Sequence, residues 1–172
     1  MALQVGQKAP DFKVEALING EFRDLSLADF NGQWKVLFFY PLDFTFICPT
    51  EITEFAAYKA EFDRLNAVVL GCSTDSVYSH LAWSKTDAIQ SLNYPLLSDK
   101  NHTLSRSYGV LIEDEGIALR GCFIIDPQGV LRYQLVHDNN VGRSVPEVLR
   151  VLYALQTGGL CPASWKPGQP LL

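Results

Sequence analysis

The four cysteines of the chain, at positions 48, 72, 122 and 161, are the residues best suited to do chemistry. No two of them lie within three residues of each other, so the sequence contains no C-x-x-C pair. Paired cysteines supply the ligands of zinc ribbons and fingers, and they form the dithiol of thioredoxin-type oxidoreductases. The spacing argues against both kinds of site, and each cysteine has to be assessed by its own surroundings.

Cys48 stands where a helix is expected to begin. Pro49 suits the first turn of a helix, where a missing N–H costs little, and apolar residues such as Ile52 follow at helical intervals to about residue 66. The unpaired N–H groups and the positive end of the dipole at a helix N-terminus favour a thiolate over a thiol. Because a thiolate is what nucleophilic attack requires, Cys48 is predicted to be the reactive cysteine.

The residues that precede Cys48 are expected to shape its pocket. Thr45 can point its hydroxyl at the sulfur or at an approaching oxygen, and Pro41, Phe44 and Phe46 would shield the pocket from bulk water. A buried, inert residue is the ordinary alternative for any single cysteine. Position and neighbours together favour the reactive interpretation here.

Strands and helices alternate around this segment. The expected strands are residues 35–40, 67–72, 95–98, 121–125 and 130–136, and the expected helices are residues 49–66, 80–88, 103–108 and 144–157. An Asn19-Gly20 pair predicts a further hairpin near the N-terminus. Crossover helices impose parallel neighbours and hairpins impose antiparallel ones. The order therefore predicts an α/β protein with a thioredoxin-like fold, a mixed central sheet and an N-terminal β-hairpin extension.

The length of 172 residues fits one folded domain, which we expect to span residues 1–157. Residues 158–172 contain three glycines and three prolines and are predicted to form a C-terminal tail that carries Cys161. With 48% hydrophobic and 19% charged residues, the composition is that of an ordinary globular protein.

Charge and hydropathy exclude two classes of partner. The formal net charge is -5 and no basic run occurs, which disfavours nucleic acid. The longest apolar run, residues 36–40, is far shorter than the roughly 20 residues of a membrane span. The N-terminal residues also lack the apolar region of a secretory signal, so we expect a cytoplasmic protein whose thiols are kept reduced.

The sequence of residues 41–51, PLDFTFICPTE, contains the P-x-x-x-T-x-x-C active-site motif of the peroxiredoxins. Matches continue at residues 6–12, 120–126, 141–145 and 161–168, the last of which contains C-P-x-x-W-K-P-G. Over nearly its whole length the chain resembles a typical 2-Cys peroxiredoxin of the alkyl hydroperoxide reductase C-like class. The resemblance implies a thiol-dependent peroxidase that reduces hydrogen peroxide and organic hydroperoxides in antioxidant defence and cell redox homeostasis.

The resemblance also implies roles for individual residues. Cys48 would be the peroxidatic cysteine, Pro41 would shield it, Thr45 would hydrogen-bond the peroxide, and Arg120 would stabilise the thiolate and the transition state. Attack on an O–O bond develops negative charge on the leaving oxygen, which a fixed guanidinium, a hydroxyl and backbone N–H groups can stabilise. This chemistry needs neither a metal ion nor an organic cofactor.

A second thiol must trap the sulfenic acid that the attack leaves on Cys48 before further peroxide oxidises it irreversibly. Cys161 lies in the tail, where mobility would let it reach a partner. The resemblance implies that it is the resolving cysteine and pairs with Cys48 of the other subunit of a homodimer, which is commonly assembled further into a decamer. Cys72 and Cys122 lie inside apolar strands and are predicted to be buried and inert.

Other polar residues are less informative. Glu51 and Arg143 match charged family positions that support the active-site arginine, but the sequence equally allows a helix-turn carboxylate and a solvated cap residue. The three histidines show no ligand spacing, and each is expected to be a surface or hydrogen-bonded residue; they are His80, His102 and His137.

Several questions stay open at this point. The reductant is either thioredoxin or a dedicated donor of the AhpF or AhpD type, and the preferred hydroperoxide is not specified. The alternatives are a redox relay or ring-shaped chaperone, a thiol–disulfide oxidoreductase, which the missing C-x-x-C disfavours, and a one-cysteine peroxidase in which Cys161 is idle. The chain lacks the G-G-L-G insertion and the C-terminal Tyr-Phe helix of peroxide-sensitive eukaryotic members, so we expect resistance to overoxidation.

Overall fold

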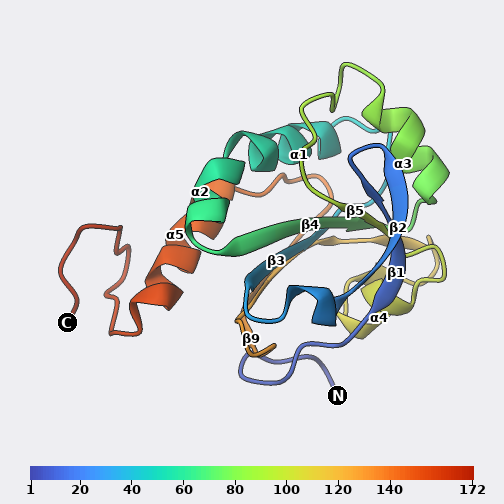
Figure 1. The fold of residues 1–172 in the computed structure, drawn as a ribbon. Coiled ribbons are helices and arrows are strands. Elements are labelled where there is room, and N and C mark those ends of the chain that lie inside the picture. Colours follow the sequence, from blue (N-terminus) through green and yellow to red (C-terminus); the bar gives the residue numbers. More distant parts are fainter.

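A seven-stranded mixed sheet with the strand order β2-β1-β5-β4-β3-β8-β9 forms the centre of the molecule (Figure 1). The computed structural model describes residues 1–172. The strands of this sheet are β1 (Lys13–Ile18), β2 (Glu21–Ser26), β3 (Trp34–Phe39), β4 (Ala67–Ser73), β5 (Leu96–Ser98), β8 (Arg120–Ile125) and β9 (Leu131–His137). The helices are η1 (Leu27–Phe30), α1 (Cys48–Ala57), α2 (Lys59–Arg64), α3 (Val77–Ser84), α4 (Thr103–Ser107) and α5 (Val145–Thr157).

The sheet combines parallel and antiparallel pairs, as expected. β3, β4 and β5 are parallel neighbours joined through helices, whereas β8 is antiparallel to β3 and β9 is antiparallel to β8. β1 adds to β5 in the antiparallel sense and forms the predicted hairpin with β2. Asn19 and Gly20 in its turn both have positive φ, of 49° and 79°, the geometry that an Asn-Gly turn favours. The prediction of a mixed α/β sheet is confirmed.

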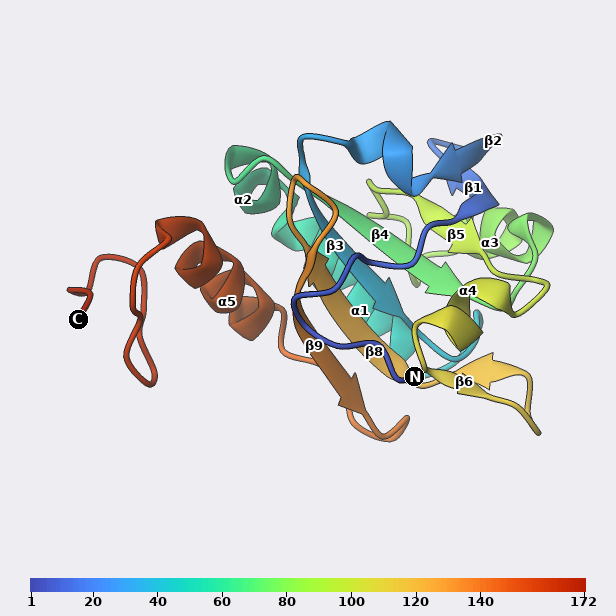
Figure 2. The same cartoon turned by 90° about the horizontal axis from the view of Figure 1, so that it is seen from below.

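Helices and loops cover both faces of the sheet, because successive side chains of a buried strand point to opposite sides. On β3 and just beyond it, Val36, Phe38 and Tyr40 pack against α1, α3 and α5. Leu37 and Phe39 point to the other face, where η1, α4 and the N-terminal segment lie. Figure 2 shows the same arrangement from below. The continuous apolar run of the sequence thus becomes a strand buried on both faces.

Two predicted helices differ from the observed ones. The segment expected as one helix over residues 49–66 is divided at Tyr58, which ends α1 and precedes α2. The helix expected over residues 80–88 begins three residues earlier, because Ser76 caps it by accepting a hydrogen bond from the Ser79 N–H, and it ends at Ser84. A short hairpin of β6 (Leu111–Ile112) and β7 (Ile117–Ala118) was not predicted at all.

The last helix matches its prediction. Ser144 caps α5 by accepting from the Glu147 N–H, and Gly158 ends it with a φ of 70°. The residues after α5 extend away from the sheet in both views (Figures 1 and 2). No helix in the structure has the length and apolar character needed to span a bilayer.

The sheet brings the start of β8 beside the end of β3. Phe38 pairs with Cys122 in this antiparallel ladder, so continuing the register by two residues sets Tyr40 opposite Arg120. The loop of residues 40–47 then leads directly from β3 into α1. An arginine that is 72 positions later in the sequence is therefore placed next to the cysteine that begins α1.

Candidate active site

Cys48 is the first residue of α1 and is fully buried. Its Sγ lies 3.3 Å from Nη1 of Arg120, which donates a hydrogen bond to it. The helix N-terminus and an adjacent guanidinium both stabilise negative charge on sulfur. The arrangement suits a thiolate nucleophile.

Arg120 is itself held in place from two sides. It is 3% exposed, so it is not the surface arginine that its position in the sequence would suggest. Nη1 also donates to Glu51 Oε1 at 2.6 Å, and Nε donates to the backbone oxygen of Asn139 at 2.9 Å. These contacts fix the guanidinium against the sulfur and leave Nη2 without a hydrogen bond inside the chain.

Glu51 joins Arg120 to a second arginine. Its Oε2 accepts from Arg143 Nε at 2.6 Å and from the Arg143 N–H at 2.8 Å. Burial alone would raise the pKa of Glu51, but the hydrogen bonds and charge of Arg143, together with Arg120, hold that pKa below its ordinary value. The carboxylate therefore stays charged and neutralises part of two buried guanidinium charges.

Arg143 ties this cluster to the sheet. Its Nη1 donates to the backbone oxygens of Phe39 and Gly121, which belong to the adjacent ends of β3 and β8. The guanidinium carbon also lies 5.2 Å from the centroid of the Phe38 ring. The structure thus places Glu51 and Arg143 in one buried network with Arg120 and Cys48.

Pro41 and Thr45 lie on the loop between β3 and α1. Pro41 is buried, and Thr45 is half-buried with its Oγ1 donating to the Leu42 backbone oxygen at 2.8 Å. The hydroxyl proton is therefore already used, and the remaining lone pairs of Thr45 can only accept a hydrogen bond. In this arrangement Thr45 can accept a hydrogen bond from an O–H group of an approaching molecule.

The prediction that Phe44 and Phe46 shield the pocket is wrong. From residue 41 to residue 46 the loop alternates in direction: Pro41 and Asp43 are buried and Thr45 is half-buried, while the even-numbered residues between them are exposed. Phe44 is 57% exposed and Phe46 is 95% exposed.

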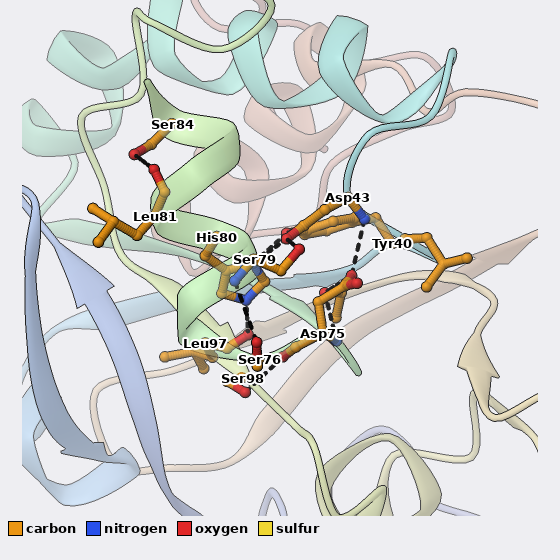
Figure 3. A network of polar contacts seen from close by, with 12 residues as sticks. Tyr40, Asp43, Asp75, Ser76, Ser79, His80, Leu81, Ser84, Leu97 and Ser98 are labelled. Carbon is orange, nitrogen blue, oxygen red and sulfur yellow. Dashed lines mark hydrogen bonds and ion pairs between the residues drawn. The ribbon is translucent and has the colours of Figure 1, made fainter. Parts of the chain in front are cut away.

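Asp43 is the centre of a buried polar network that the sequence analysis missed (Figure 3). Its carboxylate accepts from the Tyr40 hydroxyl at 2.7 Å and lies 2.7 Å from Nδ1 of His80, while its N–H donates to Asp75 at 2.9 Å. The other ring nitrogen of His80 lies 3.0 Å from the Leu97 backbone oxygen. The network anchors the active-site loop to α3, β4 and β5. An aspartate among apolar residues was the only signal in the sequence.

The surroundings of His80 favour its charged form. Both ring nitrogens face groups that only accept, the Asp43 carboxylate and the Leu97 carbonyl, so both need a proton. Burial by itself would lower the pKa of His80, but the hydrogen bond and charge of Asp43 outweigh it and raise that pKa. The buried ion pair holds the loop that carries Thr45. The expectation of a hydrogen-bonded histidine is confirmed.

Cys161 lies at the far end of α5 and is half-buried. Its Sγ is 3.7 Å from the Ala154 backbone oxygen and 3.5 Å from Thr157 Oγ1. The start of α5 follows Arg143, which contacts Glu51 in the first turn of α1. Ala154 stands nine residues after Val145, the first residue of α5, which is a rise of about 14 Å, so Cys161 lies far along α5 from the end that is next to the Cys48 region.

The other two cysteines are buried, as predicted. Burial raises the pKa of Cys72 well above its ordinary value and raises the pKa of Cys122 to about 12. Both thiols are therefore protonated and unreactive at neutral pH. The structure has no cluster of three or more His, Cys, Asp or Glu side chains that could hold a metal ion.

Comparisons with known proteins agree with this geometry. The model of the AhpC/TSA family matches residues 5–134. A thioredoxin peroxidase of Echinococcus granulosus is 53% identical over 176 residues, covering 98% of this chain and 91% of the relative. The reduced 2-Cys peroxiredoxin of Plasmodium vivax superposes with a TM-score of 0.93 at 41% identity, covering 97% of this chain and 91% of that one. AhpC of Enterococcus faecalis gives a TM-score of 0.89 at 39% identity, covering 94% and 100%.

Proposed function

The chain belongs to the AhpC/TSA family and is a peroxiredoxin, a thiol-dependent peroxidase, and from this premise we propose that Cys48 is its peroxidatic cysteine and Cys161 its resolving cysteine. The observation that carries the assignment is the 3.3 Å contact between Cys48 Sγ and Arg120 at the start of α1. Cys72 and Cys122 lack such a partner and have raised pKa values. The hydrogen-bond contacts of Cys161 are with a hydroxyl and a carbonyl, and no arginine donates to its sulfur.

In the first half of the cycle the Cys48 thiolate attacks one oxygen of a hydroperoxide. An S–O bond forms, the O–O bond breaks, and the leaving alkoxide or hydroxide takes up a proton, which leaves Cys48 as a sulfenic acid. Nη2 of Arg120 is free to donate to the developing oxyanion, and Thr45 can accept from the peroxide O–H. Glu51 and Arg143 act as positioning residues because they hold Arg120 in place.

In the second half the Cys161 thiol attacks the sulfenic sulfur, a disulfide forms, and water leaves. The two sulfurs of a disulfide require Cα atoms about 4.4–6.8 Å apart, whereas Cys161 contacts Ala154, which lies about 14 Å along α5 from the end of the helix that is next to the Cys48 region. We therefore assign the disulfide to two subunits. Because Cys48 is fully buried, the first turn of α1 has to unwind before the sulfurs meet.

A homodimer, assembled further into a decamer, is the proposed catalytic form. β9 lies at one edge of the sheet, where the N-terminal segment bonds only to its first residue, Leu131, and the rest of this edge can pair with a second copy. On another part of the surface, the exposed rings of Phe22 and Tyr78 lie with their centroids 5.2 Å apart and form an apolar surface that a contact between dimers would cover.

The remaining assignments follow from the same proposal. Residues 1–157 would act as the peroxidase domain and residues 158–172 as the tail that delivers Cys161. The electron donor would be thioredoxin or a reductant of the AhpF or AhpD type, acting in the cytoplasm, with hydrogen peroxide and organic hydroperoxides as substrates. A named relative, the thioredoxin peroxidase, supports the first of these donors.

Peroxide consumption tests the two cysteine roles separately. With dithiothreitol as donor, Cys48→Ser should abolish turnover, while Cys161→Ser should keep it because a small thiol can reduce the sulfenic acid directly. With thioredoxin as donor, both variants should be inactive. Full activity of Cys48→Ser, or of Cys161→Ser with thioredoxin, would contradict the assignment, and Cys122→Ser serves as the control.

A further inference from the structure

A largely apolar pocket lies directly beside Cys161. It has a volume of about 300 Å³, and its lining consists of Val151, Ala154 and Leu155 of α5, the two glycines that follow the helix, Cys161 itself and one charged residue, Arg150. We call it the Cys161 pocket. Val151 and Leu155 pack with the core on one side and are only partly buried, so their other side faces this hollow. The resolving sulfur thus sits at the rim of an open apolar surface.

Phe46 is the most exposed aromatic side chain of the active-site loop. It is 95% exposed, and no aromatic ring of its own subunit stacks on it. By contrast, the ring centroid of Phe44 lies 6.0 Å from that of Trp83. Moving such a ring from water into an apolar site would be favourable, because burial of apolar surface releases free energy. Its position two residues before Cys48 means that it moves whenever Cys48 moves.

The proposed disulfide brings these two features together. The Cα atoms of bonded cysteines lie about 5.5–6 Å apart, and consecutive Cα atoms are about 3.8 Å apart. Phe46 Cα can therefore be no farther than about 14 Å from Cys161 Cα, and its side chain can reach back toward the pocket. Unwinding of the first turn of α1 frees the segment of residues 46–48 to adopt such a position.

We propose that, in the disulfide-linked dimer, Phe46 of one subunit occupies the Cys161 pocket of the other subunit. The inference rests on the proposed pairing of Cys48 with Cys161 and goes beyond it by naming a noncovalent contact that favours the oxidised state. The chemical step is unchanged: sulfenic acid and thiol give a disulfide and water. The contact stabilises the unwound segment. It therefore favours the disulfide-linked state over the folded state, in which Cys48 stays in the buried site where peroxide can overoxidise it.

The test is a redox titration against reduced and oxidised dithiothreitol, with thiol alkylation and non-reducing gels to count the linked dimer. Phe46→Ala should lower the equilibrium constant for disulfide formation about tenfold, which corresponds to about 1.4 kcal/mol and is modest for an aromatic ring that enters an open pocket. Because Phe46 is 95% exposed in the reduced protein, the substitution removes little packing from the folded subunit.

A double-mutant cycle locates the contact. In a Leu155→Ala background, Phe46→Ala should change the equilibrium constant by less than about threefold, because the pocket wall is already lost. Leu65→Ala is the matched control: Leu65 is another partly buried leucine of the same core, outside the pocket, and there the effect of Phe46→Ala should stay near tenfold.

The possible results separate the two proposals. An equilibrium constant for Phe46→Ala within about twofold of wild type, or equal effects in the Leu155→Ala and Leu65→Ala backgrounds, overturns the docking proposal and leaves the two-cysteine mechanism intact. If peptide mapping of the oxidised wild type finds no Cys48–Cys161 disulfide, the proposed function fails first, and the docking proposal fails with it.

Discussion

Replacing Glu51 by glutamine removes the negative charge that two buried arginines share. The carboxylate receives hydrogen bonds from Arg120 Nη1 at 2.6 Å and from Arg143 Nε and Nη2 at 2.6 and 2.9 Å. Glutamine keeps the shape, but its NH₂ group must face an arginine donor in place of an acceptor. We therefore expect Glu51→Gln to lower both the stability of the fold and the reactivity of Cys48.

The magnitude follows from burial. Removing one partner of a buried ion pair lowers the free energy of unfolding by about 3–5 kcal/mol. Because glutamine retains one acceptor oxygen, we expect a loss near the lower end, about 3 kcal/mol. For a chain of this size each kcal/mol lowers Tm by about 2–4 °C, so Tm should fall by about 6–12 °C. Loss of one transition-state donor slows an enzyme by about 10²–10³-fold. Since Arg120 keeps its bond to Asn139, we expect a smaller loss, of about 10-fold to 100-fold.

Thermal unfolding at one protein concentration and stopped-flow reaction with hydrogen peroxide measure the two effects. Glu54→Gln is the control, because it makes the same charge change in α1 where no ion pair exists. The pKa of Glu51 is depressed, so its stabilisation is present above the ordinary value of 4.5 and is lost as the pH falls through the folded-state value. A Tm within about 2 °C of wild type together with an unchanged rate would refute the reasoning.

Three shorter predictions concern other residues. Arg120→Lys should slow the reaction of Cys48 with peroxide by about 100-fold in stopped-flow, because one ammonium cannot replace the planar fork of the guanidinium; a wild-type rate contradicts this. His80→Gln should lower the free energy of unfolding more at pH 6 than at pH 9. Because the pKa of His80 is raised, its ion pair with Asp43 stabilises the fold fully below the ordinary value of 6.5 and less as the pH rises through the folded-state value. Equal losses at both pH values in denaturant unfolding would refute this. Cys122→Ala should leave the peroxide rate within about twofold, because burial keeps this thiol protonated, and a large loss would show that it reacts.

The elements that position the site were predictable because their patterns are local. The apolar run of β3, the turn at Asn19-Gly20 and the cap at Ser144 each specify a structure within a few residues. The break of the long predicted helix at Tyr58 was not predicted, because the apolar spacing continues across it. The spacing of apolar, turn and capping residues therefore predicted where these elements lie but did not predict the helix break at Tyr58.

The contacts between distant segments could not be derived in the same way. The position of Arg120 beside Cys48 depends on the register of β8 against β3, which cannot be read from the sequence. Only the family resemblance suggested that Arg120 lies there. The Asp43–His80 pair joins residues that are 37 positions apart and had no motif to mark it. The outward direction of Phe46 was likewise not predicted, because an aromatic residue beside a reactive cysteine suggests a buried ring.

The central claim is that Cys48 of one subunit and Cys161 of another form a disulfide after reaction with peroxide. The most direct test treats wild type, Cys48→Ser, Cys161→Ser and a mixture of the two variants with one equivalent of hydrogen peroxide and examines each on a non-reducing gel. The account predicts that neither variant alone gives a Cys48–Cys161 linked dimer and that the mixture, after exchange of subunits, does. A linked dimer from Cys48→Ser alone, or none from wild type or from the exchanged mixture, would contradict it.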